Sequence, residues 1–231
     1  MASQSQAELT SQTHPSIRYI APFALFLLAL GAFGYLPLNP TWTAPLWFLI
    51  FVPICIVCWP REISVWPKRW FASIAIGVGV FLLWIAPEVL IPGYRNFPLF
   101  SNSILGHTHS SLPATALRSG WVLGWRMARA MIIVPIVEEL FWRGWLMRWL
   151  INQDFERVPL GTYAPFAFWI TALMFASEHG PYWDVGLITG AIYNLWTVRS
   201  KSLADCVLMH GVTNGVLSAY VIMSGQWQYW Q

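Results

Sequence analysis

Long apolar runs constrain this chain more than any other feature of its sequence. A helix needs about 20 mostly apolar residues to cross a bilayer, and the chain offers about seven such runs, separated by Pro, Asn, Gly and basic residues. The runs cover residues 20–38, 43–59, 70–91, 121–150, 163–175 and a little beyond, 185–198 and 203–223. The sequence therefore predicts an all-α fold, a polytopic bundle of about seven, or eight, transmembrane helices.

Composition supports a membrane protein and argues against a nucleic-acid-binding one. Hydrophobic residues make up 57% of the 231 positions and charged residues only 10%, whereas soluble domains carry about a quarter charged residues. Many of the 16 Trp residues lie near the ends of the apolar runs, where amphipathic rings meet lipid headgroups. The net charge of +3 is small, and the basic residues lie between runs rather than in one patch.

The chain is expected to form one membrane domain. Residues 1–16 are polar and lack the basic region of a signal peptide, so we predict a disordered tail followed by a single membrane domain over residues 17–231. Cys55 and Cys58 form a C-x-x-C pair inside an apolar run. A redox or metal site is one interpretation of this pair, but small buried hydrophobes are favoured.

The distribution of Lys and Arg predicts the orientation of the bundle, because cytoplasmic loops carry an excess of these residues. A cytoplasmic N-terminus leaves Arg95 and Arg118 outside. The basic residues that it places inside are Arg18, Arg61, Lys68, Arg69, Arg148, Arg157, Arg199 and Lys201. The long loop of residues 92–113 would then be external, with its His107 and His109 solvated.

Two adjacent acids and an arginine in the fourth run are the first candidate for chemistry. Ionisable groups inside spanning helices are costly and mark functional hypotheses by default. Glu139 and Arg143 are four residues apart, so they share a helix face and can form an ion pair. Glu138 projects about 100° away and is left for another role. An interfacial charge cluster is the alternative explanation for these three residues.

Two histidines in later runs strengthen the catalytic interpretation. Phe175 and His179 close the fifth run, while His210 and Asn214 lie four apart on one face of the seventh. The rise per residue conflicts with a shared site. It puts His179 at the outer end of its helix and His210 about a third of the way from the inner end. A broken, tilted or shifted helix is needed to bring the two together.

These motifs carry a family resemblance. Glu-Glu-x-x-x-Arg, Phe-x-x-x-His and His-x-x-x-Asn, in this order over residues 131–220, resemble the CAAX protease and bacteriocin-processing family, which includes the type II CAAX prenyl endopeptidases. The resemblance implies a glutamic-type intramembrane protease. In it, Glu138 and His179 would activate a water, and His210 with Asn214 would stabilise the oxyanion. Glu139, Arg143 and Phe175 would support the site.

The resemblance also implies partners and location. The expected substrate is a membrane-associated peptide or protein, cut by CAAX-type C-terminal processing or as a bacterial leader or sorting peptide, in a bacterial plasma membrane. No cofactor is expected, with zinc left open because Glu138, Glu139 and both histidines could be ligands. A non-catalytic membrane partner or immunity protein on the same fold is the alternative function, and a proton-coupled transporter is another.

Several other residues receive structural predictions. Gly186 and Gly190 have the G-x-x-x-G spacing that lets two helices approach closely. Ser202 with Asp205 has the spacing of a helix-capping box. Three further expectations concern charged and polar groups: Arg126 and Arg129 snorkel to the surface, Glu88 and Asp184 are interfacial or capping groups, and Tyr193 and Asn194 join helices or line the site.

Overall fold

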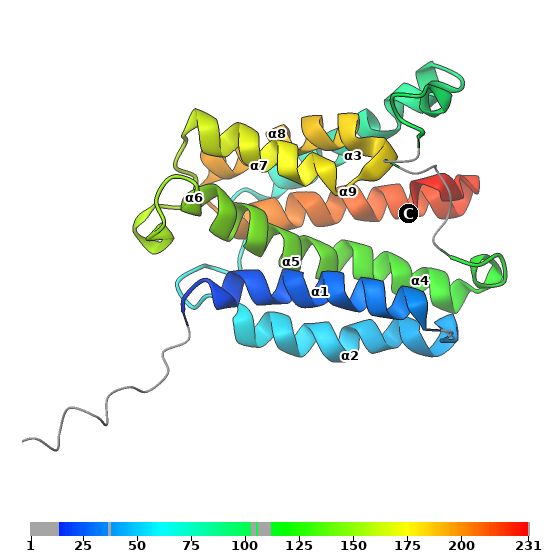
Figure 1. Cartoon of the computed structure of the whole chain (residues 1–231), viewed down its shortest axis with the longest axis horizontal. Coiled ribbons are helices and arrows are strands. Elements are labelled where there is room, and N and C mark those ends of the chain that lie inside the picture. The colour runs from blue at the N-terminus through cyan, green and yellow to red at the C-terminus, as the bar shows by residue number, and fades with distance from the viewer. Residues whose placement is uncertain (1–13, 37, 103–104, 106–111, 231) are drawn as a thin grey trace, which may run out of the picture.

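The computed structural model describes residues 14–36, 38–102, 105 and 112–230, and every regular element among them is helical. Seven long helical segments pack side by side in an elongated bundle (Figure 1). They are α1 (Ile17–Tyr35), α2 (Pro40–Cys58), α3 (Trp70–Leu90), the continuous segment Gly120–Trp149, α7 (Pro165–Ser177), α8 (Trp183–Ser200) and α9 (Leu203–Ser224). The prediction of an all-α bundle is confirmed. Most of the predicted tail, and both loop histidines His107 and His109, lie outside the described residues.

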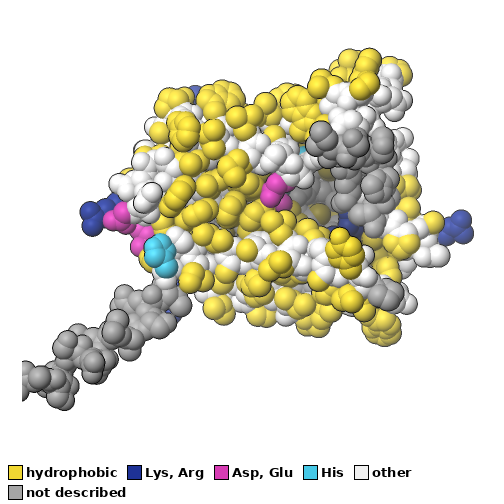
Figure 2. Space-filling view, viewed as in Figure 1, with side chains coloured by type: hydrophobic (Ala, Val, Ile, Leu, Met, Phe, Trp, Pro, Cys, Tyr) yellow, Lys and Arg dark blue, Asp and Glu magenta, His cyan; other side chains and the backbone are white. Residues whose placement is uncertain are grey.

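The surface of the bundle is suited to lipid. Five of the described helices, all except α7 and α8, are long and apolar enough to cross a membrane. Hydrophobic side chains dominate the visible face (Figure 2), and Leu28, Val57 and Phe71 are 69%, 77% and 78% exposed. Glu139 and Arg143 are fully buried instead. This arrangement is that of an integral membrane protein, with apolar groups outward and costly charges in the interior.

The segment Gly120–Trp149 is a helix with two wide turns. It comprises α4 (Gly120–Ala128), the π-helical turn η3 (Arg129–Ile133), α5 (Val134–Glu139), the π-helical turn η4 (Leu140–Leu146) and α6 (Met147–Trp149). Pro135 is the second residue of α5, just after the first wide turn, where its missing N–H removes a helical hydrogen bond. Such π-helical turns are frequent at functional sites, and these two bracket Glu138.

Helices α7 and α8 form a hairpin that reaches only part of the way along the bundle. With 13 residues, α7 is about 20 Å long at 1.5 Å per residue, shorter than the roughly 30 Å hydrocarbon core. The turn of the hairpin, η6 (Gly180–Tyr182), stops short of the end that α4 and α9 reach (Figure 1). His179 precedes this turn and therefore lies within the bundle. The depth conflict raised by the sequence is thus removed by a short helix.

Glycine permits the close packing of this hairpin. A Cβ added to Gly186 would lie 3.3 Å from the Ala176 Cα, and one added to Gly190 would lie 3.1 Å from the Ala172 carbonyl oxygen. Both distances are tighter than ordinary side-chain contacts. The predicted G-x-x-x-G interface is confirmed as the contact between α7 and α8.

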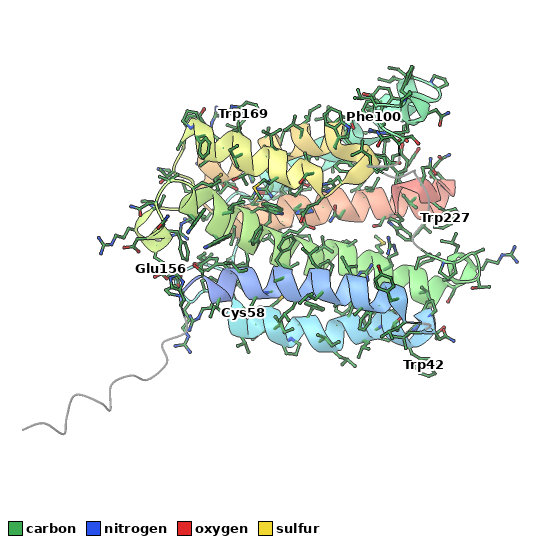
Figure 3. The ribbon with its side chains drawn as sticks, viewed as in Figure 1. Trp42, Cys58, Phe100, Glu156, Trp169 and Trp227 are labelled. Atoms are coloured by element: carbon green, nitrogen blue, oxygen red, sulfur yellow. The ribbon has the colours of Figure 1, made fainter. Side chains whose placement is uncertain are left out.

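The start of α9 is fastened to the loop before α3. The Ser202 hydroxyl accepts a hydrogen bond from the Asp205 backbone N–H at 3.2 Å, which confirms the predicted N-cap. The Asp205 carboxylate accepts hydrogen bonds from the backbone N–H groups of Lys68 and Arg69 at 2.9 and 2.7 Å. Lys68 and Lys201 therefore lie at the same end of the bundle. Figure 3 labels Cys58 and Glu156 at this end, and Trp42 and Trp227 at the other.

At the opposite end of the bundle, a second set of polar contacts surrounds the turn between α7 and α8. Arg95 is buried, donates to the Pro181 carbonyl oxygen at 2.7 Å and forms an ion pair with Asp184. Its guanidinium also lies 3.9 Å from a carboxylate oxygen of Glu88 and stacks over the Tyr182 ring. Glu88 and Asp184 thus clamp the loop to the hairpin turn, a more specific role than the interfacial or capping one predicted.

Candidate active site

The four side chains predicted to be catalytic line one cavity. This cavity has a volume of about 310 Å³ and includes Glu138, His179, His210 and Asn214 in its walls. Glu138 comes from α5, His179 follows α7, and the other two lie on α9. Segments more than 70 residues apart in sequence therefore contribute to one site.

Glu139 lies behind the cavity wall in a fully satisfied polar cluster. One carboxylate oxygen accepts from Arg143 Nη1 at 3.0 Å and from His210 Nδ1 at 2.9 Å. The other accepts from the Cys206 thiol at 3.1 Å. Because a buried carboxylate is stable only when it is paired and hydrogen-bonded, these three contacts explain how Glu139 can be 0% exposed.

Arg143 joins two other helices, α7 and α8, to the cluster. Its Nε donates to Asn194 Oδ1 at 2.9 Å, and its Nη2 donates to the Gly190 carbonyl oxygen at 3.3 Å, both on α8. The guanidinium also stacks over the Phe175 ring, 4.6 Å from its centroid. Asn194 in turn donates to the Phe168 carbonyl oxygen of α7 at 2.7 Å. The predicted helix-to-helix hydrogen bond of Asn194 is therefore present.

Glu138 has the opposite environment, although it is the next residue. Its carboxyl group lines the cavity. Its Oε2 is buried and has no hydrogen-bond partner among the described residues. A buried polar atom without a partner costs free energy unless a bound molecule satisfies it. This oxygen is therefore suited to binding a water molecule or a polar group of a substrate.

The ring of His179 is oriented by the helix that precedes it. Its Nδ1 lies 2.8 Å from the Phe175 carbonyl oxygen, which can only accept, so Nδ1 carries the proton and Nε2 is the basic atom. The ring also contacts Trp84 of α3 edge to face, with centroids 5.2 Å apart. Phe175 thus supports His179 through its backbone carbonyl group and Arg143 through its ring.

His210 and Asn214 line the cavity from one face of α9. His210 Nδ1 donates to Glu139, because a carboxylate accepts, and this bond fixes the orientation of the ring. Asn214 uses one amide N–H to donate to the Ala130 carbonyl oxygen at 2.9 Å. A side-chain amide has two N–H donors, so Asn214 retains a second one. The predicted spacing of four residues does put both groups on the cavity side.

Sequence reasoning did not assign two residues of the site, one in the cavity wall and one in the polar cluster behind it. Glu178 lines the cavity beside His179, and the available signal was an acid at the end of an apolar run. Cys206 contacts Glu139, and its position one turn before His210 on α9 indicated a shared face. Tyr193 also lines the cavity, as one of its two predicted roles required.

The prediction for Arg126 and Arg129 was wrong. Both side chains turn inward and line the cavity instead of snorkelling to the surface. The guanidinium of Arg126 lies 5.1 Å from the Trp230 ring centroid, and that of Arg129 lies 4.5 Å from the Trp47 ring centroid. Aromatic faces stabilise these cations inside the bundle, which sequence spacing alone did not indicate.

Comparison with protein-family models found a match for part of the chain. Residues 120–216 match the model of the family described as type II CAAX prenyl endopeptidase Rce1-like. This match supports the resemblance to the CAAX protease and bacteriocin-processing family that the motifs indicated. The Rce1-like segment contains all three motifs and both histidines. Comparisons with curated proteins and with solved structures returned no match.

The Rce1-like segment does not form its cavity alone. Phe23 of α1 and Trp84 of α3 lie in the cavity wall, although both precede the matched residues. Among the described residues, no three His, Cys, Asp or Glu side chains come together as a metal-ligand group. The zinc ligand set that the sequence left open is therefore a poor fit to this geometry, and a chelator experiment addresses it directly.

Proposed function

We propose that this Rce1-like protein is a membrane endopeptidase that hydrolyses a peptide bond in a membrane-associated peptide or protein. The observation that carries the proposal is the single cavity lined by Glu138, His179, His210 and Asn214. The match of residues 120–216 to a family of endopeptidases supports the same reaction class. A partner or immunity protein that only binds would not require this combination of bases and donors.

Glu138 and His179 activate the attacking water in this proposal. The partnerless Oε2 of Glu138 and the Nε2 atom of His179 accept the two hydrogen bonds that a water molecule can donate. As the water oxygen bonds to the substrate carbonyl carbon, one of its protons passes to Glu138. The carboxyl group then delivers that proton to the leaving nitrogen as the C–N bond breaks. General-base catalysis of this kind contributes about 10²–10⁴-fold.

His210 and Asn214 stabilise the negative charge that forms on the carbonyl oxygen. His210 donates through Nε2 when it is doubly protonated, with Glu139 as its counter-charge at 2.9 Å. Asn214 donates through its second amide N–H. Donors already oriented toward a developing oxyanion strengthen their bonds in the transition state, and each is worth about 10²–10³-fold in rate.

The proposed orientation follows the charge bias. The end that carries Lys68 and Lys201 faces the cytoplasm, because basic loops are retained there. The opposite end, with Arg95 and Arg118, faces the other compartment. The N-terminus of α1 is then cytoplasmic.

Cleavage of a quenched fluorescent peptide by purified protein in lipid vesicles tests the function. We expect Glu138→Gln to nearly abolish cleavage, since the amide keeps the shape but removes the base. Activity should persist in o-phenanthroline. Inhibition by the chelator that added zinc reverses, with about one zinc per chain, would contradict the glutamate mechanism. Binding without cleavage of any peptide in a membrane-peptide library would instead indicate a non-catalytic partner.

A further inference from the structure

A second polar pocket lies near the end of the bundle at which Figure 3 labels Trp227. It has a volume of about 420 Å³, within the usual range of small-molecule sites. Its wall is formed by the last turn of α3, the loop that follows, the end of α9 and the residues after it. Of its lining residues, only Tyr229 also lines the cavity of the proposed catalytic residues. The pocket is therefore a separate site.

Arg95 lines this pocket and has hydrogen-bond donors that are not used. Its side chain is 4% exposed, and its guanidinium carbon lies 4.5 and 4.9 Å from the ring centroids of Tyr182 and Phe100. Nη1 donates to the Pro181 carbonyl oxygen and to Asp184. Nε and Nη2 are buried and have no hydrogen-bond partner among the described residues. Because unsatisfied buried donors cost free energy, an acceptor oxygen of a bound molecule would stabilise Arg95.

Glu88 gives the same pocket an unsatisfied acceptor. The hydroxyl groups of Tyr182 and Tyr229 interact with its carboxyl group. Its Oε2 atom is nevertheless buried and lies beyond hydrogen-bond distance of every donor in the described part of the chain. Arg95 pairs closely with Asp184, whereas its Nε is 3.9 Å from Glu88 Oε1. One positive and two negative groups therefore meet here, and the charge of Glu88 is left without a close partner.

These two unsatisfied groups define the chemistry of a ligand. Glu88 requires a cation that donates hydrogen bonds, and Arg95 requires an acceptor oxygen close to that cation. A quaternary ammonium group has no N–H to donate, so it would leave Oε2 of Glu88 unsatisfied. A primary amine with a neighbouring phosphate meets both requirements, either as a free metabolite or as the headgroup of a lipid.

The position of the pocket favours the lipid. With 22 residues, α9 is about 33 Å long at 1.5 Å per residue, close to the roughly 30 Å hydrocarbon core, so its end lies at headgroup depth. Val89 lines the pocket and is 59% exposed, and the adjacent Leu90 is 76% exposed. Acyl chains of a bound lipid can pack against both. Tyrosines are typical of this interface, and three line the pocket: Tyr94, Tyr220 and Tyr229.

We propose that this pocket binds the headgroup of a phospholipid with a primary amine, such as phosphatidylethanolamine. The ammonium group contacts Glu88, and a phosphate oxygen accepts from Arg95. The proposal is independent of the endopeptidase function. Both residues also contact the turn between α7 and α8, through Pro181 and Tyr182. A bound headgroup therefore stabilises this turn, which directly follows His179.

The first experiment compares phospholipids that differ only in the methylation of the headgroup amine. Native mass spectrometry of the full chain in detergent micelles gives the Kd for ethanolamine, N-methyl, N,N-dimethyl and choline headgroups on the same acyl chains. We expect phosphatidylethanolamine to bind about 10- to 100-fold more tightly than phosphatidylcholine, because hydrogen bonds to a charged group are lost on methylation. The methylated intermediates should lie between them, and the unfolding temperature should rise in the same order.

Variants then assign the preference to the pocket. Glu88→Gln removes the charge but keeps an oxygen that can accept from Tyr182, and it should lower the ethanolamine-to-choline affinity ratio toward one. Arg95→Lys loses the Nη2 donor and should weaken both lipids, because both carry the phosphate. Glu156→Gln, at an exposed glutamate at the other end of the bundle, should change neither affinity. Circular dichroism shows whether each variant folds.

A labelling experiment on the unaltered chain locates the lipid even where a variant does not fold. Phosphatidylethanolamine with a diazirine near the glycerol end of an acyl chain should crosslink to the segment of residues 88–96, and the choline analogue should do so much less. Soluble phosphoethanolamine should displace the lipid only at far higher concentration, since it lacks the chains that pack against Val89 and Leu90.

Four outcomes would overturn the proposal. Equal affinity for ethanolamine and choline lipids, or an unchanged ratio in a folded Glu88→Gln variant, would show that Glu88 does not bind the amine. Crosslinking confined to other segments would place the lipid elsewhere. Displacement by phosphoethanolamine at the concentration of the lipid would identify a free metabolite as the ligand. All four measure binding rather than cleavage, so they leave the proposed endopeptidase function untouched.

Discussion

Glu138 and Glu139 are neighbours in sequence with opposite environments. Glu139 faces the interior and accepts hydrogen bonds from Arg143, His210 and Cys206. Glu138 faces the cavity, and its Oε2 atom has no partner among the described residues. The roughly 100° rotation between successive helical residues separates the two roles. A saturated carboxylate holds neighbouring groups in position, whereas an unsaturated one can act on a ligand.

Replacing each glutamate by Gln should give the largest and most contrasting effects. We expect Glu138→Gln to reduce kcat by about 10²–10⁴-fold with little change in the unfolding temperature. Glu139→Gln leaves Arg143 buried without its counter-charge, a change worth about 3–5 kcal/mol of stability. Activity assays and thermal unfolding measure the two effects. Glu156→Gln, at an exposed glutamate, is the control. Similar losses of stability in Glu138→Gln and Glu139→Gln would contradict the proposed difference between the two glutamates.

Substitutions of Arg143, the ion-pair partner of Glu139, test the same contrast between the two glutamates. Arg143→Ala leaves Glu139 as an unpaired buried charge and should cost about 3–5 kcal/mol, with activity lost as well. Arg143→Lys keeps the charge but loses the fork that reaches both Glu139 and Asn194, so partial activity is expected. Arg157→Ala, at a surface ion pair, should change neither property. An Ala variant with full activity would remove Arg143 from the supporting cluster.

Asn194 lies at the edge of the polar cluster, and its substitution should have the smallest effect on stability and activity. Asn194→Ala removes one hydrogen bond to the charged Arg143 and one to the Phe168 carbonyl oxygen. Hydrogen bonds to charged groups contribute about 1.5–3 kcal/mol each. We therefore expect the free energy of unfolding, measured with denaturant, to fall clearly. The kcat for peptide cleavage should change little. Asn96→Ala, at an exposed residue near the hairpin turn, is the matched control. A fall in kcat without a fall in stability would instead indicate that Asn194 acts in catalysis.

Sequence periodicity predicted the helices well but not the depth of their residues. Long apolar runs are sufficient to predict spanning segments, because the bilayer demands a fixed length. The same rule misjudged the position of His179, since α7 has only 13 residues and the hairpin turns back inside the bundle. Likewise, Asp205 matched a local capping pattern, but its carboxylate also binds the loop before α3. That contact spans more than 130 residues of sequence and leaves no local signal.

The sequence by itself determined the all-α membrane fold, the pairing of Glu139 with Arg143 and the shared face of His210 and Asn214. Each follows from helical geometry over one to six turns. Only the tertiary structure decided that His210 and Asn214 meet Glu138 and His179 in one cavity, and that Arg126 and Arg129 turn inward against Trp rings. The reason is physical: an arginine in a spanning helix can reach the headgroups or stack on an aromatic ring. The choice depends on which distant helix brings a ring within reach.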